Sequence, residues 1–200
     1  MPRAFTTEES ERIRERLLLA GRESFARGGL RGTTVEGLAR AAAISKGAFY
    51  RFFDSKEALL LELLAEHERA EHARIEEAVR ADPARVIDVL VDGAVHAVER
   101  APFLAVLMSE EGLRVVGSLT PAEQKDLMER DDRTIARIFA ALREAGMTLD
   151  LTEDALLGLT RSLVFTGWHR ADIGAGPVDA MAAWLKGALR PIPLDRQETP

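Results

Sequence analysis

Apolar residues recur three and four positions apart along most of this 200-residue chain, and this period is the signature of amphipathic helices. Ile13, Leu17 and Ala20 mark one apolar stripe near the start of the chain. The alternation typical of half-buried strands is weak, whereas Ala, Leu, Glu and Arg, which favour helices, dominate the composition. We therefore expect an all-α fold with about nine helices.

Proline and glycine set the expected helix boundaries. Pro83, Pro102, Pro121 and Pro177 fall where helices are expected to start, the position at which proline costs least. Gly28-Gly29 is expected to end the first helix, and Gly112, Gly146 and Gly174–Gly176 lie near other expected breaks. The helices are predicted over residues 8–27, 34–42, 45–53, 56–80, 83–100, 102–110, 120–145, 152–171 and 177–190.

This pattern predicts two domains, residues 1–55 and residues 56–190. Residues 191–200 contain three prolines and no apolar period, so we expect them to form a disordered tail. The two domains differ in charge: residues 1–56 hold 11 Lys and Arg against 7 Asp and Glu, whereas residues 57–200 hold 16 against 26. This asymmetry indicates a polyanion-binding module on an acidic partner domain, although chance remains an alternative.

The segments 34–42 and 45–53 have the lengths and the spacing of a helix-turn-helix. Thr33 with Glu36 fits a capping box for the first helix, Ser45 is a good N-cap for the second, and Asp54 or Ser55 is expected to cap the next. In a helix-turn-helix the second helix enters the major groove and presents its N-terminal side chains to the bases.

The second helix has two different faces. Its leading edge holds the small, polar and basic residues Ser45, Lys46, Gly47 and Ala48, while Phe49 and Phe53 are expected to anchor its rear in the core. Tyr50 is predicted to point outward, where its hydroxyl can reach a phosphate oxygen. Lys56 begins the following helix, whose N-terminus favours an anion. The alternative is a well-capped helical hairpin whose basic residues are merely solvated.

Residues 29–59, GLRGTTVEGLARAAAISKGAFYRFFDSKEAL, resemble the N-terminal domain of the tetracycline-repressor (TetR) family of bacterial transcription regulators. The residues that match the family pattern are Thr34, Val35, Leu38, Ala39, Ala42, Ile44, Ser45, Gly47, Phe49, Tyr50, Phe53, Ser55, Lys56, Glu57 and Leu59. Two positions depart from the pattern. Ala43 replaces the usual turn glycine, which costs about 1 kcal/mol if that position needs a positive φ, and Phe52 replaces the usual His or Tyr.

The resemblance implies an N-terminal three-helix DNA-binding domain and a homodimer that binds double-stranded DNA at a palindromic operator. The candidate DNA contacts are Thr34, Ser45, Lys46, Gly47, Ala48, Tyr50, Arg51 and Lys56. Arg40 is an equally balanced case between a backbone contact and a solvated residue. Phe52 is left open between packing on the rear face and an apolar contact to a thymine methyl group.

The resemblance also implies that the C-terminal helices form a small-molecule effector pocket and pair with those of a second subunit. The candidate pocket residues, each of which can instead be ordinary core, are His96, Phe103, Leu107, Met108, Phe139, Arg161 and Phe165. The candidate dimer residues are Leu156, Leu163, Trp168, Met181, Trp184 and Leu185.

Several classes of protein find no support in the sequence. The chain has no cysteine, and no nucleophile elbow, phosphate loop or HExxH motif is present. His67 and His72 are five positions apart and do not share a helix face, so neither a metal, a cofactor nor an enzyme is expected. No signal peptide or membrane span is recognisable, which predicts a cytoplasmic protein. We expect a ligand-responsive transcriptional repressor; the alternative is a helical small-molecule-binding or scaffolding protein that does not bind DNA sequence-specifically.

Overall fold

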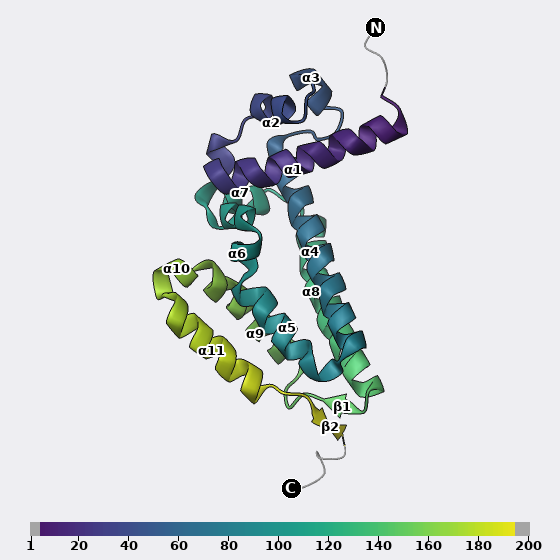
Figure 1. Ribbon diagram of the computed structural model, residues 1–200, viewed down its shortest axis with the longest axis vertical. Helices are drawn as coiled ribbons and strands as arrows, with labels where there is room; N and C mark the ends of the chain where they lie inside the picture. Colours follow the sequence, from purple (N-terminus) through teal and green to yellow (C-terminus); the bar gives the residue numbers. More distant parts are fainter. Residues whose placement is uncertain (1–4, 195–200) are drawn as a thin grey trace. The chain divides into compact units, whose positions relative to one another are not determined.

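The computed structural model describes residues 5–194, with the side chains of residues 126–128 excepted. Its regular elements are almost all helices (Figure 1), which confirms the all-α prediction. The α-helices are α1 Thr7–Gly32, α2 Val35–Ala41, α3 Lys46–Phe49, α4 Lys56–Ala81, α5 Val86–Val95, α6 Ala97–Arg100, α7 Glu110–Gly117, α8 Pro121–Glu144, α9 Glu153–Trp168, α10 Arg170–Ile173 and α11 Ala175–Ala188. Two 3₁₀ helices, η1 Pro83–Arg85 and η2 Pro102–Met108, and two short strands, β1 Met147–Thr148 and β2 Ile192–Pro193, complete the set.

The contacts of the chain divide it into two compact units. Unit 1 consists of Met1–His67 and Ala101–Ser118, and unit 2 consists of Glu68–Arg100 and Leu119–Pro200. This division differs from the expected boundary at residue 56. The first twelve residues of α4 pack within unit 1, and a segment from the middle of the chain, 101–118, joins unit 1 because η2 and α7 pack against α1.

Unit 1 is built around α1 (Figure 1). α2 and α3 lie along one side of α1, and η2 and α7 pack against another part of it. α1 is longer than the predicted 8–27, since the chain resumes helical geometry after a kink at Gly29, which has φ 62° and ψ −169°. α1 approaches α4 closely at Gly21, where an added Cβ would lie 3.0 Å from the side chain of Leu59. The side chains of Phe25, Leu59 and Leu63 are buried here.

Gly112 lies in the first turn of α7, near the break at Ser109 that precedes this helix, and it also has a packing role that the sequence did not predict. A Cβ at this position would lie 2.1 Å from the carbonyl oxygen of Val106 and 2.7 Å from the Cα of Leu107. The glycine is therefore required by the close approach of α7 to η2. Helix periodicity alone cannot distinguish such a packing glycine from a helix-ending one, because both interrupt the apolar stripe in the same way.

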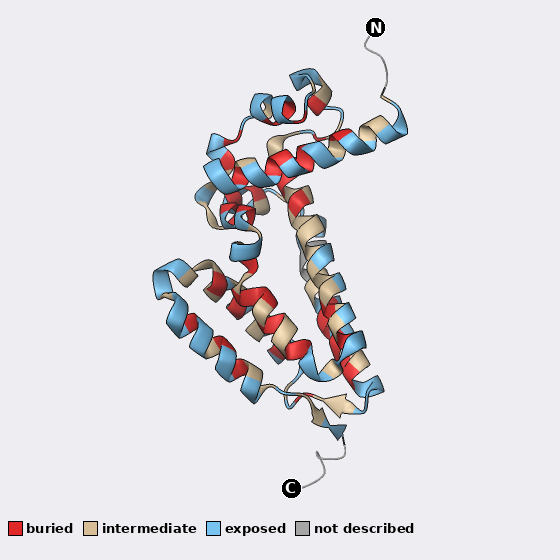
Figure 2. Ribbon diagram, viewed as in Figure 1, coloured by how far each residue is buried: buried red, intermediate tan, exposed pale blue. Residues whose placement is uncertain are grey.

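Unit 2 has its own hydrophobic core, formed by α5, α8, α9 and α11 with the end of α4. Figure 2 shows the buried residues along the inner faces of these helices. α5 and α9 approach each other closely at Gly167, where an added Cβ would lie 2.7 Å from the carbonyl oxygen of Val95. The buried members of this core include Val86, Ile87, Leu90, Val91, Ile138, Phe139, Leu142, Leu156, Leu163, Val178 and Leu185.

The chain after α11 is ordered at first, which corrects the expectation that all of 191–200 is a tail. Ile192 and Pro193 pair antiparallel with Thr148 and Met147, and the Leu194 N–H donates to the Gly146 carbonyl at 3.1 Å. Proline is tolerated because this two-stranded ladder is an edge. Residues 195–200 of the predicted tail lie outside the described residues. None of the described helices is both long enough and apolar enough to span a membrane.

Candidate nucleic-acid interface

The first helix of the motif, α2, is capped by Thr34. Its Oγ1 accepts a hydrogen bond from the Gly37 N–H at 3.1 Å, so the predicted capping box, Thr33 with Glu36, was wrong by one position. Thr33 is buried, and its hydroxyl donates instead to the Gly29 carbonyl at 2.8 Å. The two adjacent threonines therefore have different tasks: Thr33 closes the end of α1, and Thr34 opens α2.

The turn between α2 and α3 requires a left-handed residue. The Ile44 N–H donates to the Ala39 carbonyl at 2.9 Å and the Ala43 N–H to the Arg40 carbonyl at 3.1 Å, which is the hydrogen-bond pattern of a Schellman motif. Ala43 has φ 54° and is exposed. Because this conformation favours glycine, alanine here carries backbone strain.

The second helix of the motif, α3, is short. Ser45 caps it by accepting from the Ala48 N–H at 3.1 Å. The α-helix ends at Phe49 rather than Phe53, and the chain continues through tight turns. Phe49 and Phe53 are buried, with ring centroids 6.0 Å apart, so their predicted role as the rear anchor agrees with the structure.

The opposite edge of α3 faces outward. Ser45, Lys46 and Gly47 are exposed, and Ala48 is half-buried. A Cβ at Gly47 would meet no other atom within 4 Å, so this glycine leaves open space in front of the helix. Tyr50 is 48% exposed and lies edge-on to Phe49, with ring centroids 5.5 Å apart. Thr34 and Arg51 are also exposed.

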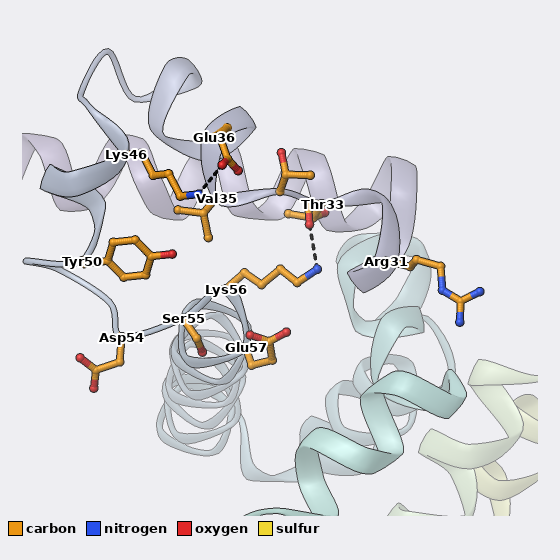
Figure 3. A pocket seen from close by; sticks show the side chains of 11 residues that line it. Arg31, Thr33, Val35, Glu36, Lys46, Tyr50, Asp54, Ser55, Lys56 and Glu57 are labelled. Atoms are coloured by element: carbon orange, nitrogen blue, oxygen red, sulfur yellow. Dashed lines mark hydrogen bonds and ion pairs between the residues drawn. The ribbon is translucent and has the colours of Figure 1, made fainter.

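A cavity of about 350 Å³ lies in unit 1 beside this edge (Figure 3). α2, α3, the start of α4 and the end of α1 contribute its walls. The cavity holds cations and anions in equal number: Arg31, Lys46 and Lys56 against Glu36, Asp54 and Glu57, together with Thr33, Thr34, Val35, Tyr50 and Ser55. Its mixed charge differs from the simple basic edge that the sequence suggested.

Lys56 points into the protein as well as along the cavity. Its ammonium donates to the Leu30 carbonyl at 2.6 Å and to the Thr33 carbonyl at 2.9 Å (Figure 3 shows the latter bond). These acceptors belong to the C-terminal end of α1, so the lysine fastens the start of α4 to it. An ammonium has three donors, and two of the three are used within the fold.

Lys46 is paired with Glu36 across the motif (Figure 3). The two side chains form a hydrogen-bonded ion pair, and each is 54% exposed. The hydrogen bond from Lys46 lowers the pKa of the Glu36 carboxyl, and the same bond raises the pKa of the Lys46 ammonium. Sequence reasoning missed Glu36 as a surface residue because its place in a T-x-x-E pattern suggested a capping role.

Phe52 packs against Phe5, which lies two residues before the start of α1. Its ring centroid lies 6.0 Å from that of Phe5, and the guanidinium of Arg51 lies over the same Phe5 ring at 4.7 Å. Phe5 thus contacts both residues. The role left open for Phe52 in the sequence is, in this structure, packing against the beginning of the chain.

The predicted effector-pocket residues divide between the two units. Phe103, Leu107 and Met108 belong to unit 1, where the first two are buried. The remaining four lie in unit 2 and differ from one another. Phe139 is core, Phe165 is 54% exposed, Arg161 is exposed and pairs with Asp132 at 3.3 Å, and the His96 ring is 2.8 Å from Glu99.

The predicted dimer residues separate into two groups. Leu156, Leu163 and Leu185 are buried in the core of unit 2. Trp184 is 69% exposed, and Met181 and Trp168 are half-buried. The exposed faces of α9 and α11 carry two aromatic residues, Phe165 and Trp184, among the small residues Ala155, Gly158, Ser162, Ala180, Ala183, Gly187 and Ala188.

A capped helix, a Schellman turn and a second short helix with an exposed polar edge define a helix-turn-helix DNA-binding protein. The comparisons with known proteins show which proteins this chain resembles. Residues 17–63 match the family described as "Bacterial regulatory proteins, tetR family". The HTH-type transcriptional regulator UidR of Escherichia coli K12 is 25% identical over 185 residues, which are 90% of each chain. The N-terminal part of the chain is therefore similar to this family of bacterial regulators, and the relative that matches over most of the chain is a transcriptional regulator.

Solved structures show the same fold. E. coli NemR in its reduced form aligns with a TM-score of 0.67 and 19% identity, over 88% of this chain and 97% of that one. PfmR, a TetR-family regulator from Thermus thermophilus, aligns with a TM-score of 0.58 and 24% identity, over 94% and 97%. FadR from Bacillus subtilis, in complex with stearoyl-CoA, aligns with a TM-score of 0.60 and 14% identity, over 86% and 95%.

Proposed function

We propose that this protein is a homodimeric repressor that binds a palindromic DNA operator and leaves it when a small apolar or amphipathic molecule binds to unit 2. The observation that carries the proposal is the exposed edge of α3, Ser45 to Gly47, held in place by the buried Phe49 and Phe53. Operator and effector are expected to meet in the cytoplasm.

The open space at Gly47 allows the backbone of α3 to approach the floor of the major groove. Ser45 and Lys46 then lie closest to the bases, and Ala48 borders them. Thr34 and Tyr50 are placed to donate hydroxyl hydrogens to phosphate oxygens. The Thr34 oxygen already accepts a bond from the Gly37 N–H, which leaves its O–H hydrogen available as a donor. Arg51 and Lys56 add positive charge to this surface.

Dimerisation is proposed through the exposed faces of α9 and α11. Small residues such as Gly158 and Gly187 let two helices approach closely, and Trp184 supplies a large apolar anchor of the kind enriched at interfaces. Trp168, Met181 and Phe165 border this face, with Phe165 moved here from the predicted pocket because its side chain is exposed. Two-fold symmetry then requires a palindromic operator with half-sites about 34–36 Å apart, or a multiple of that spacing.

The class of effector is proposed by analogy with a ligand bound to a protein of the same fold. FadR, which shares this fold, was solved with stearoyl-CoA, a molecule with a long apolar chain and a charged head. The apolar core of unit 2 is compatible with a ligand of this type, and His96 and Arg161 remain candidates for its polar end. Met108, Phe103 and Leu107 are less suited to this role, since they belong to unit 1.

The proposal is tested by selecting duplexes from a random pool and measuring their affinity by fluorescence anisotropy at several salt concentrations. We expect a palindromic consensus and an affinity that falls steeply with salt, because bound phosphates release counterions. Tyr50→Phe removes one phosphate hydrogen bond and is expected to weaken binding about tenfold, since a bond to a charged group contributes roughly 1.5–3 kcal/mol.

Trp184→Ala tests the dimer face by analytical ultracentrifugation and is expected to raise the dimer dissociation constant at least tenfold. The alternative is a helical small-molecule-binding or scaffolding protein. It would be favoured if the selection enriched no sequence and the affinity for duplex DNA did not change with salt concentration.

A further inference from the structure

Glu36 is an anion on the surface proposed to face DNA, and the contacts to phosphate described above give it no role. It is the second residue of α2, it is exposed, and its carboxylate lies beside the cavity that Thr34, Tyr50 and Lys56 line (Figure 3). A carboxylate next to DNA phosphates is repelled by them. A group of this kind on a DNA-facing edge is favourable only if it meets a hydrogen-bond donor, and DNA offers such donors on its base edges.

We propose that Glu36 and Lys46 act as one unit that reads a single G·C base pair in the major groove, the Glu36 carboxylate accepting from the cytosine N4 amino group and the Lys46 ammonium donating to guanine O6 and N7. The inference rests on the proposed function and specifies part of the operator that the protein selects.

The geometry of the pair supports this reading. Lys46 begins α3 and Glu36 lies in the first turn of α2, and the ion pair between them holds the two side chains next to each other. A donor-only group and an acceptor-only group are therefore presented side by side. Both side chains are about half exposed, so each retains capacity for a partner outside the protein, and the adjacent Gly47 leaves room for the base edge.

The chemistry of the base edges selects G·C over A·T. Across the major groove, a G·C pair presents two adjacent acceptors, guanine N7 and O6, and then the cytosine N4 donor. Lys46 can engage both acceptors while Glu36 accepts from the neighbouring donor. An A·T pair places its donor between two acceptors, so a lysine beside a carboxylate meets one acceptor at most on each side. At A·T the Glu36 carboxylate can accept from adenine N6 while Lys46 reaches a single acceptor, so G·C provides one more hydrogen bond to a charged group than A·T does.

The pair also has a role before DNA binds. In the free protein the Glu36 carboxylate is paired with the Lys46 ammonium. This pairing reduces the attraction of Lys46 to the phosphates of DNA of any sequence. At an A·T pair in this position Lys46 loses one of its two acceptors, and opposite phosphates alone Glu36 meets no donor. Lys46 alone would add sequence-independent affinity; with Glu36 beside it, affinity depends on the base pair that the two meet.

The test compares the full-length wild-type protein with Glu36→Gln by selection from a random duplex pool, followed by anisotropy titrations on single-base-pair variants of the consensus. Glu23→Gln, on α1 of the same unit, is the matched control because it removes the same charge from another exposed carboxylate. We expect the wild type and Glu23→Gln to require G·C at one position of each half-site, with about a tenfold loss on changing it to A·T. For Glu36→Gln that discrimination is expected to fall to about twofold or to shift towards A·T, whose adenine N6 and N7 suit an amide.

Two results would overturn the inference while the proposed function stands. In the first, Glu36→Gln binds DNA with an unchanged base preference at every position. In the second, it binds all sequences more tightly by the same factor, which would make Glu36 only a repulsive charge. A wild-type protein that selects no duplex would instead remove the proposed function and this inference with it. Thermal melts monitored by circular dichroism establish that each variant is folded, and because Glu36 and Glu23 are both exposed, no large change is expected.

Discussion

Replacing Ala43 with glycine is expected to stabilise unit 1. Ala43 has φ 54° at the end of α2, in a Schellman turn whose two hydrogen bonds fix that conformation. For a residue with a Cβ the left-handed region costs about 1–2 kcal/mol, and Ala43→Gly removes that cost. The methyl group is exposed, so its loss removes little packing.

The gain is reduced by the unfolded state. Glycine is more flexible when unfolded, which destabilises the folded protein by about 0.4–1 kcal/mol relative to alanine. The net expectation is therefore a stabilisation of about 0.5–1 kcal/mol. Ala41→Gly is the matched control, because Ala41 is exposed and is the last residue of α2. At position 41 glycine loses more conformational entropy on folding than alanine does and relieves no strain, so the free energy of unfolding should fall by about 0.5–1 kcal/mol.

Amide hydrogen exchange of peptides covering residues 34–53 measures the effect where it arises. Tryptophan fluorescence is a poor probe here, because Trp168 and Trp184 both belong to unit 2. Exchange in these peptides should slow about two- to fivefold in Ala43→Gly and accelerate by a similar factor in Ala41→Gly, since 1.4 kcal/mol corresponds to a factor of ten. If both variants lost stability equally, the left-handed strain at Ala43 would be refuted.

Three further outcomes are expected. Gly47→Leu should leave the thermal midpoint within a few degrees of the wild type, because the site is open, yet lower operator affinity at least about tenfold by blocking the approach of α3; equal affinity would contradict close approach. Lys56→Met leaves the Leu30 and Thr33 carbonyls without their donor and should cost about 1–3 kcal/mol in urea denaturation, whereas a loss below about 0.5 kcal/mol would contradict the clamp. The Asp179 carboxyl has a lowered pKa because Arg170 donates to it, so its stabilisation is present above the unfolded pKa and is lost as pH falls through the folded value; a melt series from pH 6 to pH 2 should show a smaller acid loss for Asp179→Asn than for the wild type.

The helices and the helix-turn-helix could be predicted from sequence because their signals are local. Ser45 caps α3, and the Phe49 and Phe53 pair is buried; both follow from residues within a turn of each other. The strain at Ala43 was also predictable, since the family pattern places glycine there and the turn needs a positive φ. The single-residue error at Thr33 is local as well: two adjacent threonines satisfy the capping pattern, and only the hydrogen bond from Thr33 to the end of α1 separates them.

Features set by contacts between distant parts of the chain could not be predicted in this way. The role of Gly112 depends on η2 and that of Gly167 on α5, and neither contact leaves a pattern around the glycine itself. Leu163 and Phe165 illustrate the same difficulty on one helix. Two residues apart on an α-helix point in different directions, but an apolar stripe that is wide enough for two partners does not say which side meets the core. The structure places Leu163 inside and Phe165 outside.

Lys56 shows why a residue of the family pattern is not by itself a DNA contact. Its place at the N-terminus of α4 suggested a phosphate ligand, yet two of its donors bind carbonyls at the end of α1. Weaker operator binding by a Lys56 variant therefore has two possible causes, a lost phosphate contact or a displaced α4. Salt dependence separates them. Loss of one phosphate contact in each half-site makes the negative slope of log K against log salt less steep by about 1.8 for the dimer, whereas a displaced α4 that leaves the other contacts intact lowers affinity at an unchanged slope.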